Sequence, residues 1–484
     1  MAATKLSRRE FLRQTALVGA SVLAASCAPP VVERTVVVEP TKPAPPEKVV
    51  KVIPFLTEES DPDSIKVYQQ IAAEFRDEHP DVAIDLVTTN APDVLLQRIQ
   101  QAVAVGAELG IFTINDFTYA EVAPEGLLLP LDEIYEDVGA DKWYPGAATG
   151  LPDGHMYALA YSGGFYTVLW ARSDMMEKEG LGDPTTFEET LELVKALTQD
   201  TNGDGEIDIY GAGIPTSNIW CTGCAFTSAL YANCGDYFDD QGNVVFDHPN
   251  ALEAVKRYAT LAEYAPDAAS SWSWGDIIQS FIAKRTATCW YYGRAGWNTY
   301  RADPELRAKM KPLAFITGEK DLGFGSFDKL AVYSKVKWPK EALEFVKFML
   351  TGDRVVRFLL TVPGHLSPPY AGLEELVLKS DHPYIKEYGE QVAFLFSRAG
   401  KGASPSSFMG FIDPDTCEPD FTLQIVPWGG RVFGGHDSVP ALVIQRIAVK
   451  GETPEQAHQW GVEEFKKRVD EWKSENPDWK PPTT

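Results

Sequence analysis

Three signatures that would assign many chains to a class are missing from this sequence of 484 residues. Beyond residue 26, no run approaches the ~18 uninterrupted apolar residues that a membrane-spanning helix needs. No Gly-x-Ser-x-Gly stretch and no His-Glu-x-x-His stretch occurs. The sequence therefore gives no sign of the commonest serine-hydrolase or zinc-protease sites. No internal repeat is visible either.

Positive charge is also in short supply. The chain carries 44 Lys and Arg against 69 Asp and Glu, a net charge of −25 at pH 7. Without residues 1–26 the balance is 40 against 68, or −28. Such a surface repels polyanions, which argues against nucleic acid or anionic lipid as the ligand. A neutral ligand is unaffected by this argument.

Cysteine is scarce, with six in the whole chain. Five of them follow the N-terminal region, and an odd number cannot all pair: Cys221, Cys224, Cys234, Cys289 and Cys417. Outside the cytosol a disulfide is expected to persist, and Cys221 with Cys224 is one candidate for a tight pair. No His lies at the usual zinc spacing from them. The sequence does not decide which of these cysteines form a disulfide.

The N-terminal region has the features of an export signal. Residues 7–13 resemble a twin-arginine pattern, and Thr15 to Ala25 is apolar but too short to cross a bilayer. Cys27 follows Ala24-Ala25-Ser26, which resembles a lipoprotein cleavage site. We expect a signal peptide (1–26), lipidation of Cys27 and a proline-rich tether (27–47) on the outer side of the cell membrane. The alternative is an ordinary cleaved signal ending at the same small residues.

From Val49 to Pro130 the apolar pattern alternates between strand and helix, which indicates an α/β lobe with helices on both faces of its sheet. In such sheets ligands lie beyond the carboxyl ends of the strands. The loops that follow the first and third expected strands therefore belong near a cleft. They contain Glu58, Asn115 and Asp116.

The stretch from Asp153 to Gly213 links this lobe to the rest of the chain. Met156 to Ala171 is rich in aromatic, small and β-branched residues and is too long for one ordinary strand. Gly163 and Gly164 in its middle predict a bend or a close backbone approach. Thr186 and Glu189 then form a capping-box pattern at the start of a helix.

These segments, in this order, resemble the maltose-binding-protein-like family 1 of extracellular solute-binding proteins of ABC importers. The departures from the family pattern are Ala160 for the usual Pro and Arg172-Ser173 for Asn-Lys. The resemblance spans most of residues 48–475. The matching residues are Phe75, His79-Pro80-Asp81-Val82, Gly126-Leu127, Pro130-Leu131-Asp132, Asp153-Gly154, Tyr157, Gly180-Leu181, Pro184-Thr185-Thr186, Tyr210-Gly211, Phe281, Gly296-Trp297, Gly451 and Thr453-Pro454-Glu455.

The resemblance implies a two-lobed periplasmic-binding-protein fold of α/β class (type II, the Venus-flytrap architecture) with hinge crossings between the lobes. We expect residues 48–158 plus 312–363 in one lobe and 165–308 plus 371–484 in the other. The implied function is to capture a carbohydrate, a mono- or oligosaccharide, and to deliver it to the permease subunits. The protein would be a monomer and not an enzyme, with no required cofactor and only its lipid anchor in the membrane.

A sugar presents C–H faces that flat rings cover and hydroxyl groups that polar side chains satisfy. Rings cluster between Trp290 and Trp297, with Arg294 between them. Each of these rings could instead belong to the core. We expect the cleft to be lined by Glu58, Asn115, Asp116, Tyr161, Trp220, Trp290, Arg294, Trp297 and Trp428.

One polar loop has a calcium-like pattern. Asp200, Asn202, Asp204 and Asp208 supply oxygens at the spacing of the first nine positions of an EF-hand loop. The twelfth position is Gly211, so the bidentate glutamate is missing. The loop is either a weak structural Ca²⁺ site or a polar turn without metal.

Two rival functions remain at this stage. Acidic residues near Glu58 would suit a polyamine, and a polyol is also possible for such a cleft. An extracellular glycoside hydrolase would need two carboxylates flanking one bond. No motif singles out such a pair.

Overall fold

Two separate β-sheets organise the part of the chain that the computed structural model describes. These residues are 50–89, 92–151, 153–239, 241–398, 402–403, 411–420, 427–433 and 438–480. The predicted signal peptide, Cys27 and the proline-rich tether lie outside them. No described helix is both long and apolar enough to cross a bilayer.

The larger sheet has seven strands in the order β2-β1-β3-β9-β5-β4, with β10 paired to β9. β1 runs parallel to β2 and β3, whereas β9 runs antiparallel to β3 and β5. A mixed sheet of this kind buries its central strands on both faces. Its strands are β1 (Lys51–Thr57), β2 (Val82–Thr88), β3 (Ile111–Ile114), β4 (Ala148–Gly150), β5 (Met156–Phe165), β9 (Gly323–Val332) and β10 (Gly402–Ala403).

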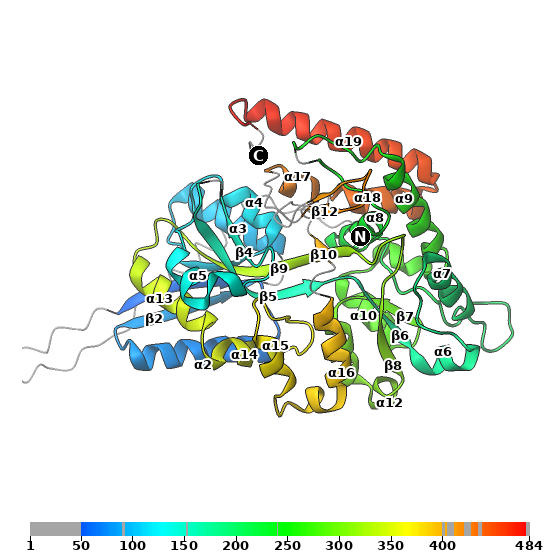
Figure 1. Cartoon of the computed structure of the whole chain (residues 1–484), viewed down its shortest axis with the longest axis horizontal. Helices are drawn as coiled ribbons and strands as arrows, with labels where there is room; N and C mark the ends of the chain where they lie inside the picture. The colour runs from blue at the N-terminus through cyan, green and yellow to red at the C-terminus, as the bar shows by residue number, and fades with distance from the viewer. Residues whose placement is uncertain are drawn as a thin grey trace, which may run out of the picture. The chain divides into compact units, whose positions relative to one another are not determined.

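Helices cover this sheet and complete the first lobe. Figure 1 shows α2 and α14 below the sheet and α3 and α4 above it. In α2 the Asp61 side chain accepts the Asp63 N–H, and Tyr68, Ile71 and Phe75 form its buried face. These helices are α2 (Pro62–Glu78), α3 (Pro92–Val105), α4 (Asp116–Val122), α5 (Asp132–Val138), α13 (Pro339–Leu350) and α14 (Asp353–Leu359), with a short 3₁₀ turn at Ala140–Lys142.

The smaller sheet is the centre of the second lobe. It has the order β7-β6-β8, all antiparallel: β6 (Val168–Arg172), β7 (Thr288–Trp290) and β8 (Met310–Ala314). Around it lie α6 (Ser173–Glu179), α7 (Phe187–Ala196), α8 (Trp220–Ala232), α9 (Pro249–Ala262), α10 (Trp274–Ile282), α11 (Gly293–Ala302) and α12 (Pro304–Arg307), with a 3₁₀ turn at Asp267–Ser271. Twelve of the thirteen residues of α8 are buried. A helix apolar all round is expected to be a central one.

The remaining elements follow the last return of the chain. They are α15 (Leu373–Leu378), α16 (Pro383–Ser397), β11 (Phe411–Ile412), β12 (Pro419–Asp420), α17 (Gly429–Phe433), α18 (Val439–Lys450) and α19 (Pro454–Glu475). The start of α19 is fixed by local hydrogen bonds. Thr453 and Gln456 form a capping box, in which each side chain accepts the backbone N–H of the other.

Long strands connect the two sheets. β5 leads into β6 with only Tyr166 and Thr167 between them, and β8 leads through residues 315–322 into β9. An isolated antiparallel bridge between Gly163 and Ser367 brings the segment around Ser367 alongside β5, close to the connection with β6. The predicted fold class is thus confirmed, whereas the exact lobe boundaries stay a prediction. β8 pairs within the smaller sheet, so residues 310–314 lie with the second lobe.

Gly163 and Gly164 were predicted to mark either a bend or a close backbone approach. In the structure they allow a close approach. Gly163 and Gly164 remain in β5, opposite Phe327 and Ser326 of β9. A Cβ at Gly163 would lie 2.8 Å from the Phe327 ring, closer than real Cβ atoms come to such a ring. The strand breaks two residues later instead, at Tyr166.

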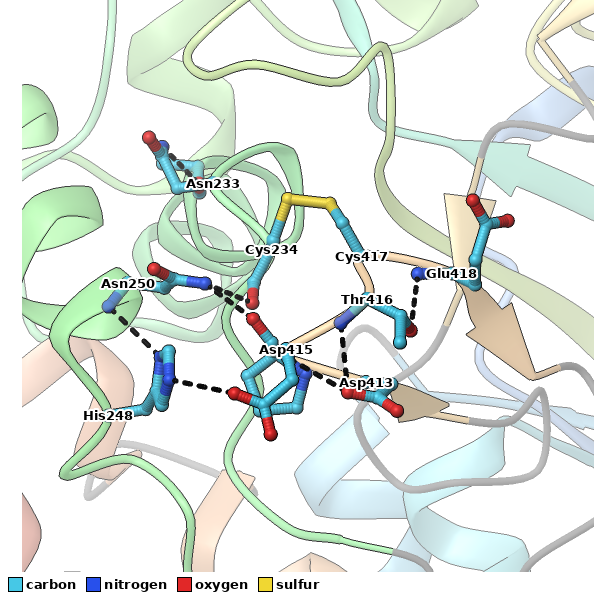
Figure 2. The surroundings of a disulfide bond; sticks show 11 residues. Asn233, Cys234, His248, Asn250, Asp413, Asp415, Thr416, Cys417 and Glu418 are labelled. Carbon is cyan, nitrogen blue, oxygen red and sulfur yellow. Dashed lines mark hydrogen bonds and ion pairs between the residues drawn. A yellow bond between two sulfur atoms is a disulfide. The ribbon is translucent and has the colours of Figure 1, made fainter.

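One disulfide, Cys234–Cys417, ties the end of α8 to the β11–β12 hairpin (Figure 2). Cys221, Cys224 and Cys289 are free and buried, so the suggested Cys221–Cys224 pair is wrong. Asn250 reinforces the junction, because its side-chain amide donates to the carbonyl oxygens of Cys234 and Pro414. Buried Asp236 accepts the N–H of Ile412 at 2.8 Å.

Candidate ligand-binding site

A cavity of about 210 Å³ lies between the two lobes. Its walls combine aromatic rings with a small set of polar groups, which is typical of ligand sites. The lining residues are Glu58, Glu59, Ser60, Leu96, Asn115, Phe117, Thr118, Tyr161, Tyr166, Trp220, Trp274, Tyr291, Arg294, Phe324, Ser326, Asp328, His365, Gly430 and Phe433.

The first lobe contributes the loops at the carboxyl ends of β1 and β3. Glu58 and Glu59 follow β1 directly, and Asn115 follows β3. Hydrogen bonds fix these loops, because the Glu58 N–H donates to Thr113 Oγ1 at 3.2 Å. Asn115 caps α4 by accepting the Thr118 N–H at 2.9 Å. Ligand-facing residues at these strand ends are what the α/β architecture predicts.

Strand β9 contributes alternate residues. Phe324, Ser326 and Asp328 line the cavity, while Phe327 and Lys329 between and after them are buried. Successive side chains of a strand point to opposite faces, so one face of β9 presents a ring, a hydroxyl and a carboxylate in a row. Ser162 Oγ on the neighbouring strand donates to Asp328 at 3.3 Å.

The second lobe contributes most of the rings. Tyr166 is central, with ring centroids 6.2 Å from Trp220, 5.6 Å from Tyr291 and 5.7 Å from Phe324. Burial raises the pKa of Tyr166 and of Tyr291 well above the ordinary range. Both hydroxyl groups therefore keep their protons and can donate hydrogen bonds to a ligand.

Arg294, near the start of α11, joins the two lobes. Its guanidinium lies 3.2 Å from Glu59 Oε2 and 3.5 Å from Asp61 Oδ2, both on the loop after β1. Burial is the largest single influence and opposes the charge, but Glu59, Tyr291 and Asp61 together outweigh it, so the pKa of Arg294 is raised. The pair of acids and Arg294 therefore form an ion-paired contact across the mouth between the lobes.

Two further titratable groups face the cavity. Burial, followed by the charge of Glu59, raises the pKa of Asp328 to about 6. Burial, followed by the charge of Arg294, lowers the pKa of His365 well below its ordinary value. The His365 ring lies against Tyr291 with centroids 6.0 Å apart. Near pH 7 the cavity therefore holds a neutral imidazole and a largely ionised Asp328.

Five of the nine residues expected in the cleft line this cavity. They come from both lobes and are Glu58, Asn115, Tyr161, Trp220 and Arg294. Tyr161 is on β5, where its ring contacts Phe358 with centroids 5.3 Å apart. The structure thus brings these five together, and their binding to a ligand stays a prediction.

The other four lie elsewhere, in each case because a packing partner holds the side chain. Asp116 is fully buried and forms an ion pair with buried Lys329. Trp290 is fully buried and its indole N–H donates to the Tyr166 carbonyl at 3.1 Å. Trp297 stacks on Tyr300 one turn along α11. Trp428 is buried with centroids 5.5 Å from Trp472 and 5.0 Å from Trp479.

Several lining residues were not predicted. Tyr291 takes the place expected for Trp290, because β7 ends at Trp290 and the next residue reaches the cavity. The alternation of Phe324, Ser326 and Asp328 in the sequence could have predicted a strand that presents both polar and apolar side chains on one face. His365 had no such signal. Its position depends on a tertiary contact with Tyr291.

α17 closes one side of the cavity with Gly430 and Phe433. A Cβ at Gly430 would lie 1.8 Å from Glu121 Oε1 on α4, so a larger residue at this position would require the Glu121 side chain to move. Burial raises the pKa of Glu121, and the charge of Arg431 opposes that shift.

The loop predicted as a calcium site satisfies its own hydrogen bonds. Asp200 accepts the N–H groups of Gly203 and Gly205, and Asp208 accepts the N–H and hydroxyl of Thr201. Asn202 accepts the Asp204 N–H at 2.8 Å. Within the described ranges, no group of three or more His, Cys, Asp or Glu converges as metal ligands would. These contacts fit a polar turn, and calcium binding stays an untested prediction.

Comparison with known proteins defines the class. The model of the bacterial extracellular solute-binding protein family matches residues 61–352, more than half of the chain. The chain belongs to this family. Membership means that it is a solute-binding protein and that it works outside the cytoplasm.

Individual relatives are distant. One is YcjN of Escherichia coli (strain K12), which is named as an ABC transporter periplasmic-binding protein. It is 22% identical over 343 residues, which cover 67% of this chain and 74% of YcjN.

Solved structures are similar in fold. T. maritima MalE3 with bound maltose has a TM-score of 0.67 at 18% identity, covering 86% of this chain and 99% of that one. An ABC transporter solute-binding protein from Agrobacterium vitis S4 with bound D-mannitol has a TM-score of 0.68 at 17% identity, covering 87% and 99%. The two-lobed fold is therefore shared, although the sequences are not close.

Proposed function

We propose that this protein captures a carbohydrate, a mono- or oligosaccharide, between its lobes and delivers it to the permease of an ABC importer. One observation carries the proposal. The cavity between the lobes combines at least five aromatic rings with carboxylates, an amide and a guanidinium: Phe117, Tyr166, Trp220, Tyr291, Phe324, Glu58, Asp328, Asn115 and Arg294.

This combination suits the two surfaces of a sugar. Rings such as Trp220 and Tyr291 would cover the C–H faces, and Asn115 and Asp328 would pair with hydroxyl groups. In a water-poor cavity an unpaired hydroxyl is costly, so the polar groups select the pattern of hydroxyl positions. The similar structures solved with maltose and with D-mannitol support sugars or polyols as the ligand class.

Capture would use hinge closure. The residues between β5 and β6 and between β8 and β9 are short connections that can change backbone angles, as hinges do. A ligand that touches Glu58 and Asn115 on one lobe and Trp220 on the other gains its contacts only when the lobes close. It therefore shifts the population toward the closed state.

The protein would work as a monomer held at the cell membrane through lipidated Cys27. The proline-rich residues 27–47 would let the lobes reach the permease.

Ligand screening by thermal unfolding tests the proposal. A ligand at a hundred times its Kd stabilises the native state by about 2.7 kcal/mol, so a bound sugar or polyol raises Tm. The Trp220→Ala variant should bind at least tenfold more weakly, about 1.4 kcal/mol, because a stacking face is lost. Its own Tm should change little, since Trp220 is only partly buried.

Trp338→Ala is the matched control, because Trp338 is also partly buried but lies outside the cavity. It should leave affinity unchanged. Failure of every sugar and polyol in a broad panel to raise Tm would refute the proposed function.

A further inference from the structure

The lining of the cavity carries more negative than positive charge. Three carboxylates line it, from Glu58, Glu59 and Asp328. Among the described residues, Arg294 is the single Lys or Arg in the lining. Glu58 and Glu59 come from the first loop of the chain and Asp328 from β9, so the acids approach the cavity from two separate elements.

Arg294 does not balance these charges. Its guanidinium is matched by Glu59 at 3.2 Å and by Asp61 at 3.5 Å, and Asp61 itself lies outside the lining. Arg294 with its two partners therefore has a net charge of −1. His365 adds no positive charge near pH 7, because its burial disfavours the imidazolium form.

Lys329 offsets them only in part, because its charge lowers the pKa of Asp328 by less than burial and Glu59 raise it. It follows Asp328 in the sequence, but the strand alternation sends its side chain to the opposite face of β9. There it is fully buried and forms its ion pair with Asp116. The carboxylates of Asp328 and Glu59 consequently repel each other, and a cation between them would relieve that repulsion.

The rings provide an independent reason to expect a cation. Phe117, Tyr166, Trp220, Trp274, Tyr291, Phe324 and Phe433 line the same cavity. The faces of aromatic rings attract ammonium groups, most strongly where water is excluded. Aromatic rings together with an excess of carboxylates therefore favour a ligand that carries an ammonium group.

We infer that the ligand is a carbohydrate that carries a protonated amine, an amino sugar, with its ammonium group between Asp328 and the carboxylates of the loop after β1. This inference rests on the proposed function and narrows it. The hydroxyl groups of the sugar would contact Asn115 and Ser326, and its ring would lie against Trp220 or Tyr291.

Isothermal titration with matched sugar pairs tests the inference. Each pair is an amino sugar and its neutral parent: glucosamine with glucose, galactosamine with galactose, mannosamine with mannose, and the chitosan disaccharide with cellobiose. The N-acetyl form of each amine is a second neutral comparison. In the pair that binds, the amine should bind at least tenfold more tightly than both neutral forms. In Asp328→Asn this ratio should fall several-fold, because the amide keeps the shape and removes the charge.

Asp85→Asn is the matched control, since Asp85 is an exposed carboxylate on β2 of the same lobe. It should keep the wild-type ratio. Glu58→Gln provides a second cavity variant if Asp328→Asn does not fold, and its ratio should fall in the same direction.

The remaining outcomes separate this inference from the proposed function. If neutral sugars bind as tightly as the amines, the inference is overturned and the proposed function stands. If no sugar of either kind binds at millimolar concentration, both are overturned. Binding of spermidine alone, without any sugar, would also overturn both and assign the cavity to linear polyamines.

Discussion

The buried carboxyl group of Asp328 makes the stability of the ligand-free protein depend on pH. Its pKa of about 6 in the folded chain lies above the value of 3.8 for an ordinary Asp. Between these two values the folded state holds a proton that the unfolded state releases. Stability therefore falls as pH rises through this window, and the loss is complete above about pH 6. The charged or titratable groups near it are Glu59, Asp116, Lys329, Tyr68, Tyr161 and Tyr166.

We predict that Asp328→Asn raises the free energy of unfolding at pH 7.5 by on the order of 1–3 kcal/mol, since each pKa unit corresponds to 1.36 kcal/mol. Below about pH 3, where the carboxyl is protonated in both states, the gain should disappear. Urea unfolding at the two pH values measures this, with Asp85→Asn as the control. A variant that is less stable than wild type at pH 7.5 would contradict the prediction.

The residues of the site could be predicted only where the chain itself marks them. Glu58 and Asn115 follow strands whose apolar pattern is clear, so their place at the strand ends follows from the sheet architecture. Trp290 and Tyr291 are neighbours of similar type, and only the last paired position of β7 decides which one faces the ligand. Asp116 was misplaced because its partner Lys329 lies 213 residues away.

At the scale of elements, capping chemistry was the most reliable guide. Thr453 with Gln456 marks α19 to the residue, and Thr186 caps α7 by accepting the Glu189 N–H. The three-stranded sheet was not predicted, because β7 has only three residues and pairs with a strand more than a hundred residues earlier. Short strands stabilised by distant partners leave little periodic signal.

The disulfide holds an element that the cavity needs. Cys234–Cys417 and Asp236 fix the β11–β12 hairpin to the end of α8. α17, which follows this hairpin in the sequence, supplies Gly430 and Phe433 to the cavity wall. A disulfide also restricts the unfolded chain, and more so when the closed loop is long.

We predict that reduction of the disulfide lowers the free energy of unfolding by about 2–5 kcal/mol, because the cross-link joins residues 183 positions apart. Chemical unfolding with and without reductant measures the loss. The Cys234→Ser/Cys417→Ser double variant should match the reduced wild type and no longer respond to reductant. An unfolding midpoint that reductant leaves unchanged in the wild type would show that the pair does not stabilise the protein.

At the scale of the whole molecule, the predicted anchor is separable from the binding unit. All residues that line the cavity lie between 58 and 433, far in sequence from Cys27. We predict that Cys27→Ser moves the protein from the membrane fraction to the soluble fraction, with unchanged ligand affinity. Cell fractionation followed by titration measures both effects. If the variant stays with the membrane, the anchor is not Cys27.

The disulfide also changes how the molecule would carry a mechanical load. Tension applied to the two ends of the chain passes from Cys234 directly to Cys417 and bypasses the residues between them. The bypassed segment contains β8, β9 and Ser367. The strand that carries Asp328 therefore lies within the loop that the disulfide closes, and this loop bears no tension while the bond is intact. At about 3.4 Å per residue, on the order of 600 Å of chain is withheld from extension until the bond is reduced.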